Sequence, residues 1–294
     1  MKLHDFWMKR LDREASKLSA NTIMKHKAIA NKIEQYAPGA TLDAVNLMWL
    51  MDLEAWLIEK GNSKNTIATA MSALKSTVRQ AVNFDLIAKD PFAKYTIRKG
   101  ATYEKALDID DVKQLEAMEL SDDYAKCRDA WMFSFYCAGI RISDLVMLDV
   151  TDVAGGKLEY TMRKNGKKMA FPLSEKAQAI AEKYIAEARE AGREKLFGLV
   201  PEGLEDKMAI AKAIRAATSY GNKRLRQLSD ELGIKKATWH AARAAFATYA
   251  VRSGMDLDTV RQMLAHSDLA TTQMYLASRT QEDLGNNLSQ MMNF

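Results

Sequence analysis

Hydrophobic positions recur at helical spacing through the first hundred residues. In 63–83, intervals of 4, 3, 4 and 4 separate five apolar positions: Ile67, Met71, Leu74, Val78 and Val82. Intervals of three and four place side chains on one face of an α-helix, so this segment predicts an amphipathic helix that packs one stripe inward. Shorter patterns of the same kind predict three further helices, over 5–18, 20–36 and about 46–59.

The period changes after residue 147. Apolar residues alternate over 158–162 and again over 169–173, and Asn165-Gly166 lies between the two runs. Alternation predicts strands, and Asn-Gly between two such runs is a strong hairpin signal. Helical patterns are expected from Asp108 or Asp110 to about 119, and over 122–139, 174–191, 206–216, 220–232, 240–253, 256–264, 270–275 and 280–292. The predicted fold is mainly α with a small antiparallel β-sheet.

Length and composition narrow the class of protein. A chain of 294 residues is about twice the usual domain length, so two domains are expected. A hydrophobic content of 48% excludes a disordered chain. No apolar run approaches the roughly 18 residues of a membrane helix, and the charged N-terminus lacks a signal-peptide pattern. Cys127 and Cys137 form neither a CxxC pair nor a disulfide framework, so a cytoplasmic protein is expected.

The basic charge is concentrated in the first hundred residues. They carry 16 Lys and Arg against 10 Asp and Glu, a net of +6, whereas the rest of the chain has a net of −1. This asymmetry favours contact with a polyanion. Lys64, Lys75 and Arg79 share one direction on the predicted helix, and Lys25 is a further candidate for DNA contact. A solvated basic face is the alternative for these residues, and it stays open.

Several catalytic signatures are absent from the sequence. It has no Walker-type phosphate loop, GxGxxG, HExxH or GxSxG, and its four histidines and two scattered cysteines disfavour a zinc site. What remains is a spaced set of basic residues. Arg141 follows the apolar helix directly, within CAGIRISDLVML, and Lys164 lies near the hairpin tip together with Lys167 and Lys168.

The set continues downstream and ends at a tyrosine. His240 and Arg243, in TWHAARAAFATY, are three positions apart and therefore share one helix face. His266 follows Arg243 by 23 positions, and Tyr275 follows His266 by 9, within MLAHSDLATTQMY.

These segments together resemble the tyrosine recombinase, or phage integrase, family. The resemblance implies an enzyme whose catalytic residues are Arg141, Lys164, His240, Arg243, His266 and Tyr275. Asp144 matches an acidic position that is usually glutamate in the family. Two departures, Ala265 in place of the glycine of LGH and Ala242 in place of the leucine of HDLR, remove no reactive group.

The chemistry of such a set can be argued from its residue types. A tyrosine hydroxyl that attacks a DNA phosphodiester forms a phosphotyrosine, which preserves the bond energy for rejoining the strand. Arg141 and Arg243 can hold the non-bridging oxygens in place of a metal ion, so no metal or cofactor is expected. A free tyrosine has a pKa of about 10, so a base is needed. His240 is the candidate base, His266 a donor to the phosphate, and Lys164 the acid for the leaving 5′-oxygen, although Lys167 or Lys168 can also supply it.

The resemblance also implies an architecture and partners. A helical core-binding domain, 1–99, and a catalytic domain, 106–294, form a clamp on double-stranded DNA, joined by a basic linker, 100–105. The expected site contains inverted repeats, and a homotetramer exchanges strands through a Holliday junction, with accessory DNA-bending proteins as possible partners. The tail, 280–294, packs on its own domain or on a neighbouring protomer. A type IB topoisomerase and a non-catalytic DNA-binding regulator remain alternatives.

Overall fold

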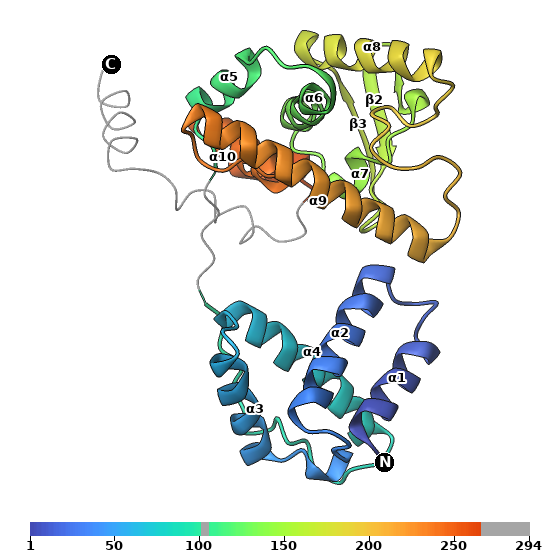
Figure 1. Cartoon of the computed structure of the whole chain (residues 1–294), viewed down its shortest axis with the longest axis vertical. Coiled ribbons are helices and arrows are strands. Elements are labelled where there is room, and N and C mark those ends of the chain that lie inside the picture. Colours follow the sequence, from blue (N-terminus) through green and yellow to red (C-terminus); the bar gives the residue numbers. More distant parts are fainter. Residues whose placement is uncertain (101–105, 266–294) are drawn as a thin grey trace. The chain divides into compact units, whose positions relative to one another are not determined.

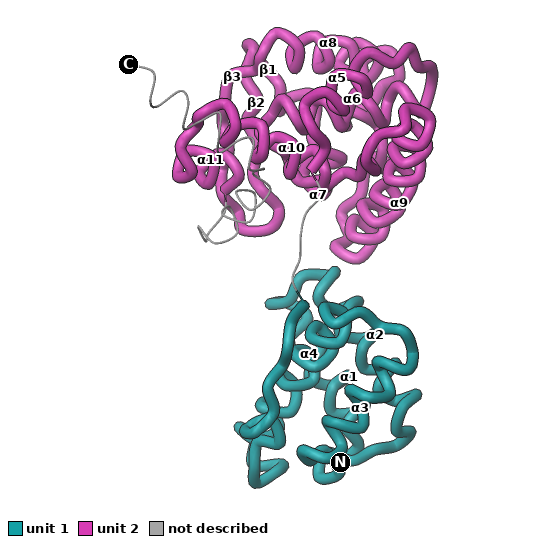
Figure 2. The backbone as a smooth tube through the Cα atoms, turned by 90° about the vertical axis from the view of Figure 1, so that its left-hand side faces the viewer, with its two compact units in different colours: residues 1–102 teal, residues 103–294 magenta. Residues whose placement is uncertain are grey.

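The computed structural model describes residues 1–100 and 106–265. The chain divides into two compact units, Met1–Thr102 and Tyr103–Phe294, each described here by itself (Figure 2). Each hydrophobic cluster found in the described ranges draws its residues from one unit only. The units therefore have separate cores.

Unit 1 is helical. Its elements are α1 (Leu3–Arg13), α2 (Ala20–Tyr36), a 3₁₀ turn η1 (Leu42–Ala44), α3 (Leu47–Glu59) and α4 (Lys64–Asn83) (Figure 1). The side chains of Ser19, Asn46 and Ser63 cap α2, α3 and α4 by accepting from backbone N–H groups of the first turn. The predicted stripe of α4 is buried, except that Val82 is only partly buried.

The first helix begins and ends earlier than its predicted range of 5–18. It ends at Arg13 because its inward-facing residues end at Leu11, and the next residues form turns. One of the inward-facing residues is Arg10, which is only 9% exposed. An arginine on a buried helix face requires polar partners, and these partners belong to the site described below.

Unit 2 packs helices around α6. Its helices are α5 (Ile109–Ala117), α6 (Asp122–Tyr136), α7 (Ile142–Leu145), α8 (Glu175–Glu190), α9 (Lys207–Leu232), α10 (Trp239–Arg252) and α11 (Leu257–Met263), with a 3₁₀ turn η2 (Val150–Asp152). Helix α6 contacts α5, α8, α9 and α10, which surround it in Figure 1. Asp108 caps α5 in a reciprocal pair with Asp111, as the sequence predicted for one of its two candidates.

The predicted hairpin is confirmed and forms the larger part of a three-stranded antiparallel sheet. Strands β1 (Val153–Ala154), β2 (Lys157–Thr161) and β3 (Lys168–Pro172) lie in the order β1-β2-β3. Leu158 pairs with Phe171 and Tyr160 pairs with Met169. The mainly α fold with one small antiparallel sheet is therefore confirmed for the described ranges.

Two helix predictions are corrected. The helices expected over 206–216 and 220–232 are one continuous helix, α9, which runs through 217–219, the residues expected to separate them. The helix expected over 122–139 ends at Tyr136, because Ala138 and Gly139 both adopt left-handed backbone conformations, with φ of +58° and +69°. The segments 270–275 and 280–292 lie outside the described residues.

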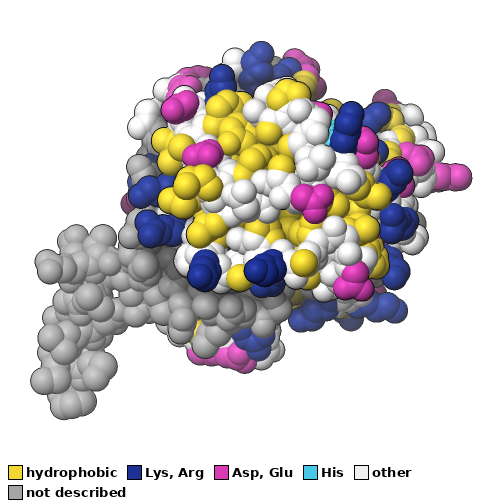
Figure 3. Space-filling view, turned by 90° about the horizontal axis from the view of Figure 1, so that it is seen from below, with side chains coloured by type: hydrophobic (Ala, Val, Ile, Leu, Met, Phe, Trp, Pro, Cys, Tyr) yellow, Lys and Arg dark blue, Asp and Glu magenta, His cyan; other side chains and the backbone are white. Residues whose placement is uncertain are grey.

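Two further features concern exposure. Cys127 and Cys137 are both buried and free of disulfides. The face of unit 1 seen in Figure 3 carries clusters of hydrophobic side chains, and the large apolar residues exposed on α3 are Leu47, Met48, Met51 and Ile58. None of the helices in the described ranges has the length and hydrophobicity of a bilayer-spanning segment.

Candidate functional site

Arg243 and the segment that carries Arg141 meet at the turn between α6 and α7. The turn contains Gly139, whose φ is +69°, and it is closed by a hydrogen bond from its N–H to the carbonyl of Ser134, at 2.7 Å. Arg243 of α10 packs directly on Gly139, because a Cβ there would lie 2.6 Å from the Arg243 Cα. Only glycine permits this approach, and it brings Arg243 beside the segment that carries Arg141.

Backbone carbonyls hold the guanidinium of Arg243. Its Nη1 donates to the carbonyl of Gly139 at 2.9 Å, and its Nη2 donates to the carbonyl of Leu264. The side chain is nearly inaccessible, with the whole residue 4% exposed. These contacts join three segments far apart in sequence and fix the orientation of a permanently charged group.

Asp144 links the start of α7 to the hairpin. Its Oδ1 accepts from the backbone N–H of Arg163 at 3.0 Å, and the residue is 3% exposed. Burial raises the pKa of Asp144, while the Arg163 N–H and the charges of Arg141, Arg163 and Arg243 act in the opposite direction. Asp144 therefore lies within electrostatic range of both Arg141 and Arg243, where it can orient them and the hairpin.

The hairpin presents Lys164 at its exposed end. The loop between β2 and β3 is closed by a hydrogen bond from the Gly166 N–H to the carbonyl of Met162, at 2.9 Å, and Gly166 has a φ of +70°. Met162 lies at the base of the loop, and Arg141 Nη1 is 3.8 Å from its sulfur. Burial raises the pKa of Tyr160 on β2, and the charge of Asp144 raises it further. The hydroxyl group of Tyr160 is therefore protonated and neutral at physiological pH.

The N-terminus of α10 positions His240. Thr238 caps this helix by accepting from the N–H of Ala241 at 3.3 Å, and the Thr238 carbonyl accepts from the indole of Trp131 at 2.8 Å. His240 lies in the first turn and is exposed, whereas Arg243, one turn later, is buried. The helix face that they share thus runs from the core to the surface.

Ala265 stands where the family usually has glycine, and its surroundings show how alanine is tolerated there. Its φ is +47°, in the left-handed region that favours glycine. An alanine in this conformation costs about 1 kcal/mol. Its buried methyl group packs with Met162 and Met169, which contributes about 0.8 kcal/mol. The two effects nearly cancel, and the segment leading to His266 is held against the hairpin. His266 and Tyr275 themselves lie outside the described residues.

Metal ligands do not gather in the described part of the chain: it contains no group of three or more His, Cys, Asp or Glu side chains arranged to hold a metal ion.

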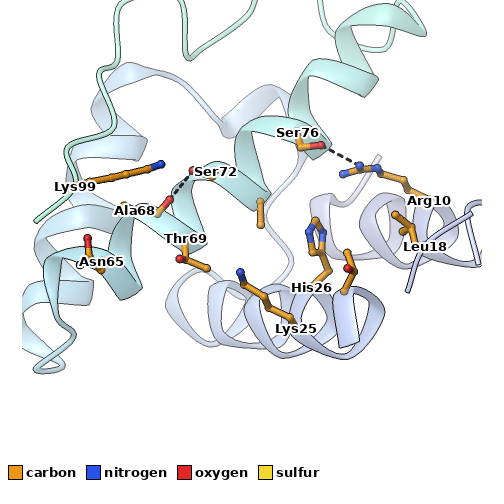
Figure 4. A pocket seen from close by; sticks show the side chains of 12 residues that line it. Arg10, Leu18, Lys25, His26, Asn65, Ala68, Thr69, Ser72, Ser76 and Lys99 are labelled. Carbon is orange, nitrogen blue, oxygen red and sulfur yellow. Dashed lines mark hydrogen bonds between the residues drawn. The ribbon is translucent and has the colours of Figure 1, made fainter. Parts of the chain in front are cut away.

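Unit 1 carries a second polar site, a pair of grooves along α4. The larger has a volume of about 540 Å³ and the smaller about 430 Å³, and both are lined by Arg10, Ser72 and Ser76. We refer to the two together as the α4 groove. Figure 4 shows α4 along one side of the larger groove, with Lys25 and His26 of α2 on the opposite side.

The floor of the α4 groove is a buried polar cluster. Arg10 donates to Thr77 Oγ1 at 2.7 Å and to Ser76 Oγ at 2.9 Å, and it pairs with Glu14 at 3.2 Å. Burial lowers the pKa of His26, and the charges of Arg10 and Lys25 lower it further. His26 is therefore neutral near pH 7, and the positive charge of the larger groove comes from Arg10, Lys25 and Lys99.

The four cations proposed from the sequence for DNA contact occupy different positions. Lys25 lines the larger part of the α4 groove, and Lys75 and Arg79 line the smaller part. Lys64 is exposed at the start of α4 and is not among the lining residues of either part. Lys75 lies 5.7 Å from the centre of the Phe92 ring, and Arg79 pairs with Asp90 at 3.1 Å.

Sequence reasoning missed most residues of this groove, among them its basic and histidine side chains Arg10, His26 and Lys99. A signal existed for Arg10, because it falls on the apolar face of α1 and needs partners there. None existed for His26, whose position depends on how α2 packs against α4. Lys99 lies in the basic first hundred residues and was not singled out there.

Comparison with known proteins identifies the family to which the chain belongs. Residues 105–282 match the phage integrase family, and residues 2–97 match the phage integrase SAM-like domain. The chain belongs to the phage integrase family. The resemblance inferred from the sequence is confirmed, and so is the expectation of a tyrosine recombinase-type enzyme, since relatives carry that name.

Relatives of this integrase-family chain include recombinases of similar length. Tyrosine recombinase XerD of Oceanobacillus iheyensis is 30% identical over 267 residues, which cover 88% of both chains. Tyrosine recombinase XerC of Pseudomonas entomophila is 28% identical over 271 residues, which cover 90% of this chain and 87% of the relative.

Among solved structures, the Tn1549 transposon integrase in complex with transposon right end DNA has a TM-score of 0.74 and 18% identity, over 99% of both chains. A lambda integrase dimer bound to a COC′ core site has a TM-score of 0.69, also at 18% identity, over 94% of this chain and 95% of that one. These likenesses show that the integrase fold extends over nearly the whole chain.

Proposed function

We propose that this protein is a site-specific DNA recombinase that cleaves and rejoins DNA through a 3′-phosphotyrosine intermediate. The observation that carries the proposal is the packing of Arg243 on Gly139, which holds one guanidinium beside the turn that leads into Arg141. A guanidinium held by backbone carbonyls, with Arg141 on the adjoining turn and Asp144 in electrostatic range of both arginines, suits a transition state that gains negative charge on non-bridging phosphate oxygens.

In the proposed reaction, the Tyr275 oxygen attacks the phosphorus and the bond from phosphorus to the 5′-oxygen breaks. His240 takes the tyrosine proton, and Lys164 gives a proton to the leaving 5′-oxygen. Arg141 and Arg243 hold the phosphate, and His266 donates to it. The exposed position of Lys164 at the hairpin loop and of His240 in the first turn of α10 leaves both groups accessible to DNA.

The partner proposed is double-stranded DNA with inverted-repeat sites, bound by four copies that exchange strands through a Holliday junction. The domains proposed are a core-binding domain, 1–99, a linker, 100–105, and a catalytic domain, 106–294. The α4 groove supports DNA contact by the first domain, because it gathers cations with hydroxyl groups. The clamp arrangement of the two units and the docking of 280–294 stay predictions.

The proposal is tested by trapping the intermediate on a nicked suicide substrate. The full-length protein should leave a denaturation-resistant adduct with DNA, and Tyr275→Phe should bind the same DNA without forming one. Tyr249→Phe is the matched control, because Tyr249 is 46% exposed and should be irrelevant to the adduct. An undiminished adduct with Tyr275→Phe would contradict the assignment. Relaxation of a supercoiled plasmid that lacks a recombination site would instead favour a topoisomerase.

A further inference from the structure

A stripe of small polar side chains runs along the groove side of α4. Asn65, Thr69, Ser72 and Ser76 follow at intervals of 4, 3 and 4 and all line the larger part of the α4 groove. This stripe lies beside the buried stripe of the same helix, and its four side chains are uncharged (Figure 4). Cations contact phosphates, whereas neutral hydroxyl and amide groups contact either phosphates or base edges, and the polarity of each group decides between the two.

Cations flank the stripe in both parts of the groove, and Ser72 and Ser76 line both parts. Lys25 and Lys99 line the larger part of the groove, and Lys75 and Arg79 line the smaller part. With 20 residues, α4 is about 30 Å long, and the major groove of DNA is wide enough to admit a helix, whereas the minor groove is not. A duplex that receives α4 in its major groove would therefore place phosphates near the cations and base edges near the stripe.

The hydrogen bonds within the protein assign opposite polarities to the two serines. Ser72 Oγ donates its one proton to the carbonyl of Ala68 at 2.6 Å, so while this bond is kept it offers lone pairs to a ligand. Ser76 Oγ accepts from Arg10 at 2.9 Å, and an arginine can only donate, so the Ser76 proton remains available to an acceptor. Arg10 is buried and also held by Thr77 and Glu14, which makes it a positioning residue for Ser76.

We propose that Ser72 is a specificity-determining residue that accepts a hydrogen bond from a base amino group in the major groove. Adenine N6 and cytosine N4 are the only amino groups presented there, so Ser72 selects adenine or cytosine at one position of the recombination site. Ser76, with the opposite polarity, donates to a neighbouring base acceptor or phosphate oxygen. The inference rests on the proposed function, since it requires duplex DNA as the ligand.

The test measures base preference and salt dependence separately. The full-length protein is bound to a pool of duplexes randomised across the site, and the bound fraction is sequenced. Ser72→Ala should reduce the preference for adenine or cytosine at one position by about fivefold, the scale of one neutral hydrogen bond, with the slope of affinity against salt unchanged. Lys25→Ala should do the reverse: it should weaken binding to all sequences and lower the slope by about one.

Ser219→Ala is the matched control, because it makes the same change at an exposed helical position of α9 and should alter neither quantity. Base preferences unchanged by Ser72→Ala would overturn the inference, and so would a lower salt slope in that variant, which would make Ser72 a phosphate contact. If the adduct through Tyr275 still forms in either case, the proposed function stands and only the role of Ser72 is wrong. Absence of any duplex binding by the full-length protein would overturn both.

Discussion

At the scale of single residues, Gly139 has two independent reasons to be glycine. Its φ of +69° lies in the left-handed region, and a Cβ would meet the Cα of Arg243 at 2.6 Å. Gly166 in the hairpin loop has nearly the same φ, +70°, but a Cβ there would meet nothing within 4 Å. A comparison of Gly139 with Gly166 therefore separates the cost of backbone strain from the cost of a clash with Arg243.

We expect Gly139→Ala to lower the free energy of unfolding by about 3 kcal/mol, because strain of about 1 kcal/mol adds to a clash with backbone that cannot move aside. Gly166→Ala should cost only the strain, about 1 kcal/mol. Urea unfolding of the full-length variants measures both. Equal losses in the two variants would show that the contact with Arg243 is not required.

Spacing along the chain singles out candidate residues in unit 2 more readily than in unit 1, and their catalytic roles stay predictions. Arg141, His240 and Arg243 are recognisable because their spacing is local or matches a family pattern. Arg10 and His26 reach the α4 groove only through the packing of α1 and α2 against α4, and no spacing along the chain expresses that. The polarities of Ser72 and Ser76 likewise depend on hydrogen bonds that sequence cannot specify.

At the scale of elements, Gly221 lies inside α9, close to the residues where two helices were expected to separate. A Cβ at this position would lie 2.3 Å from the indole of Trp239, at the first residue of α10. The glycine is therefore a packing requirement between two helices and not a break in one of them. Its N–H and carbonyl remain in the helix, while its missing side chain lets α10 approach.

Gly221→Ala tests this interpretation through the sign of its effect. Alanine is the better helix former by about 1 kcal/mol, so an open site would be stabilised. Here overpacking against the indole, at about 1–3 kcal/mol, should outweigh that gain and lower the melting temperature. Ala216→Gly, at an exposed position of the same helix, should cost about 1 kcal/mol and gives the scale of propensity alone. A higher melting temperature for Gly221→Ala would contradict the packing argument.

Element types were more predictable than element ends. Periodicity identified the helices of unit 1 and the hairpin, since apolar spacing reflects the face that each element buries. The end of α6 was missed because left-handed residues at Ala138 and Gly139 stop the helix inside an apolar run. Periodicity does not report such a change of backbone conformation.

At the scale of the whole molecule, the two separate cores predict two folding units. The core cluster of unit 1 extends from Leu3 to Tyr95 and includes large fully buried side chains such as Trp7, Phe6 and Phe92. We expect residues 1–100, produced alone, to unfold cooperatively, with an enthalpy of about 70 kcal/mol for a domain of this size. Scanning calorimetry measures it. A broad transition without a heat-absorption peak would show that this core needs the rest of the chain.

The two cysteines give this division a chemical readout. Both lie in unit 2, and they are the only cysteines of the chain. Burial raises the pKa of Cys127 to about 11 and also raises the pKa of Cys137, so neither thiol is ionised in the folded protein near pH 8. An alkylating reagent reacts with the thiolate, so labelling has to wait for unit 2 to open. The rate at which both cysteines of the intact chain become labelled therefore measures the opening of unit 2 alone. No engineered reporter residue is needed.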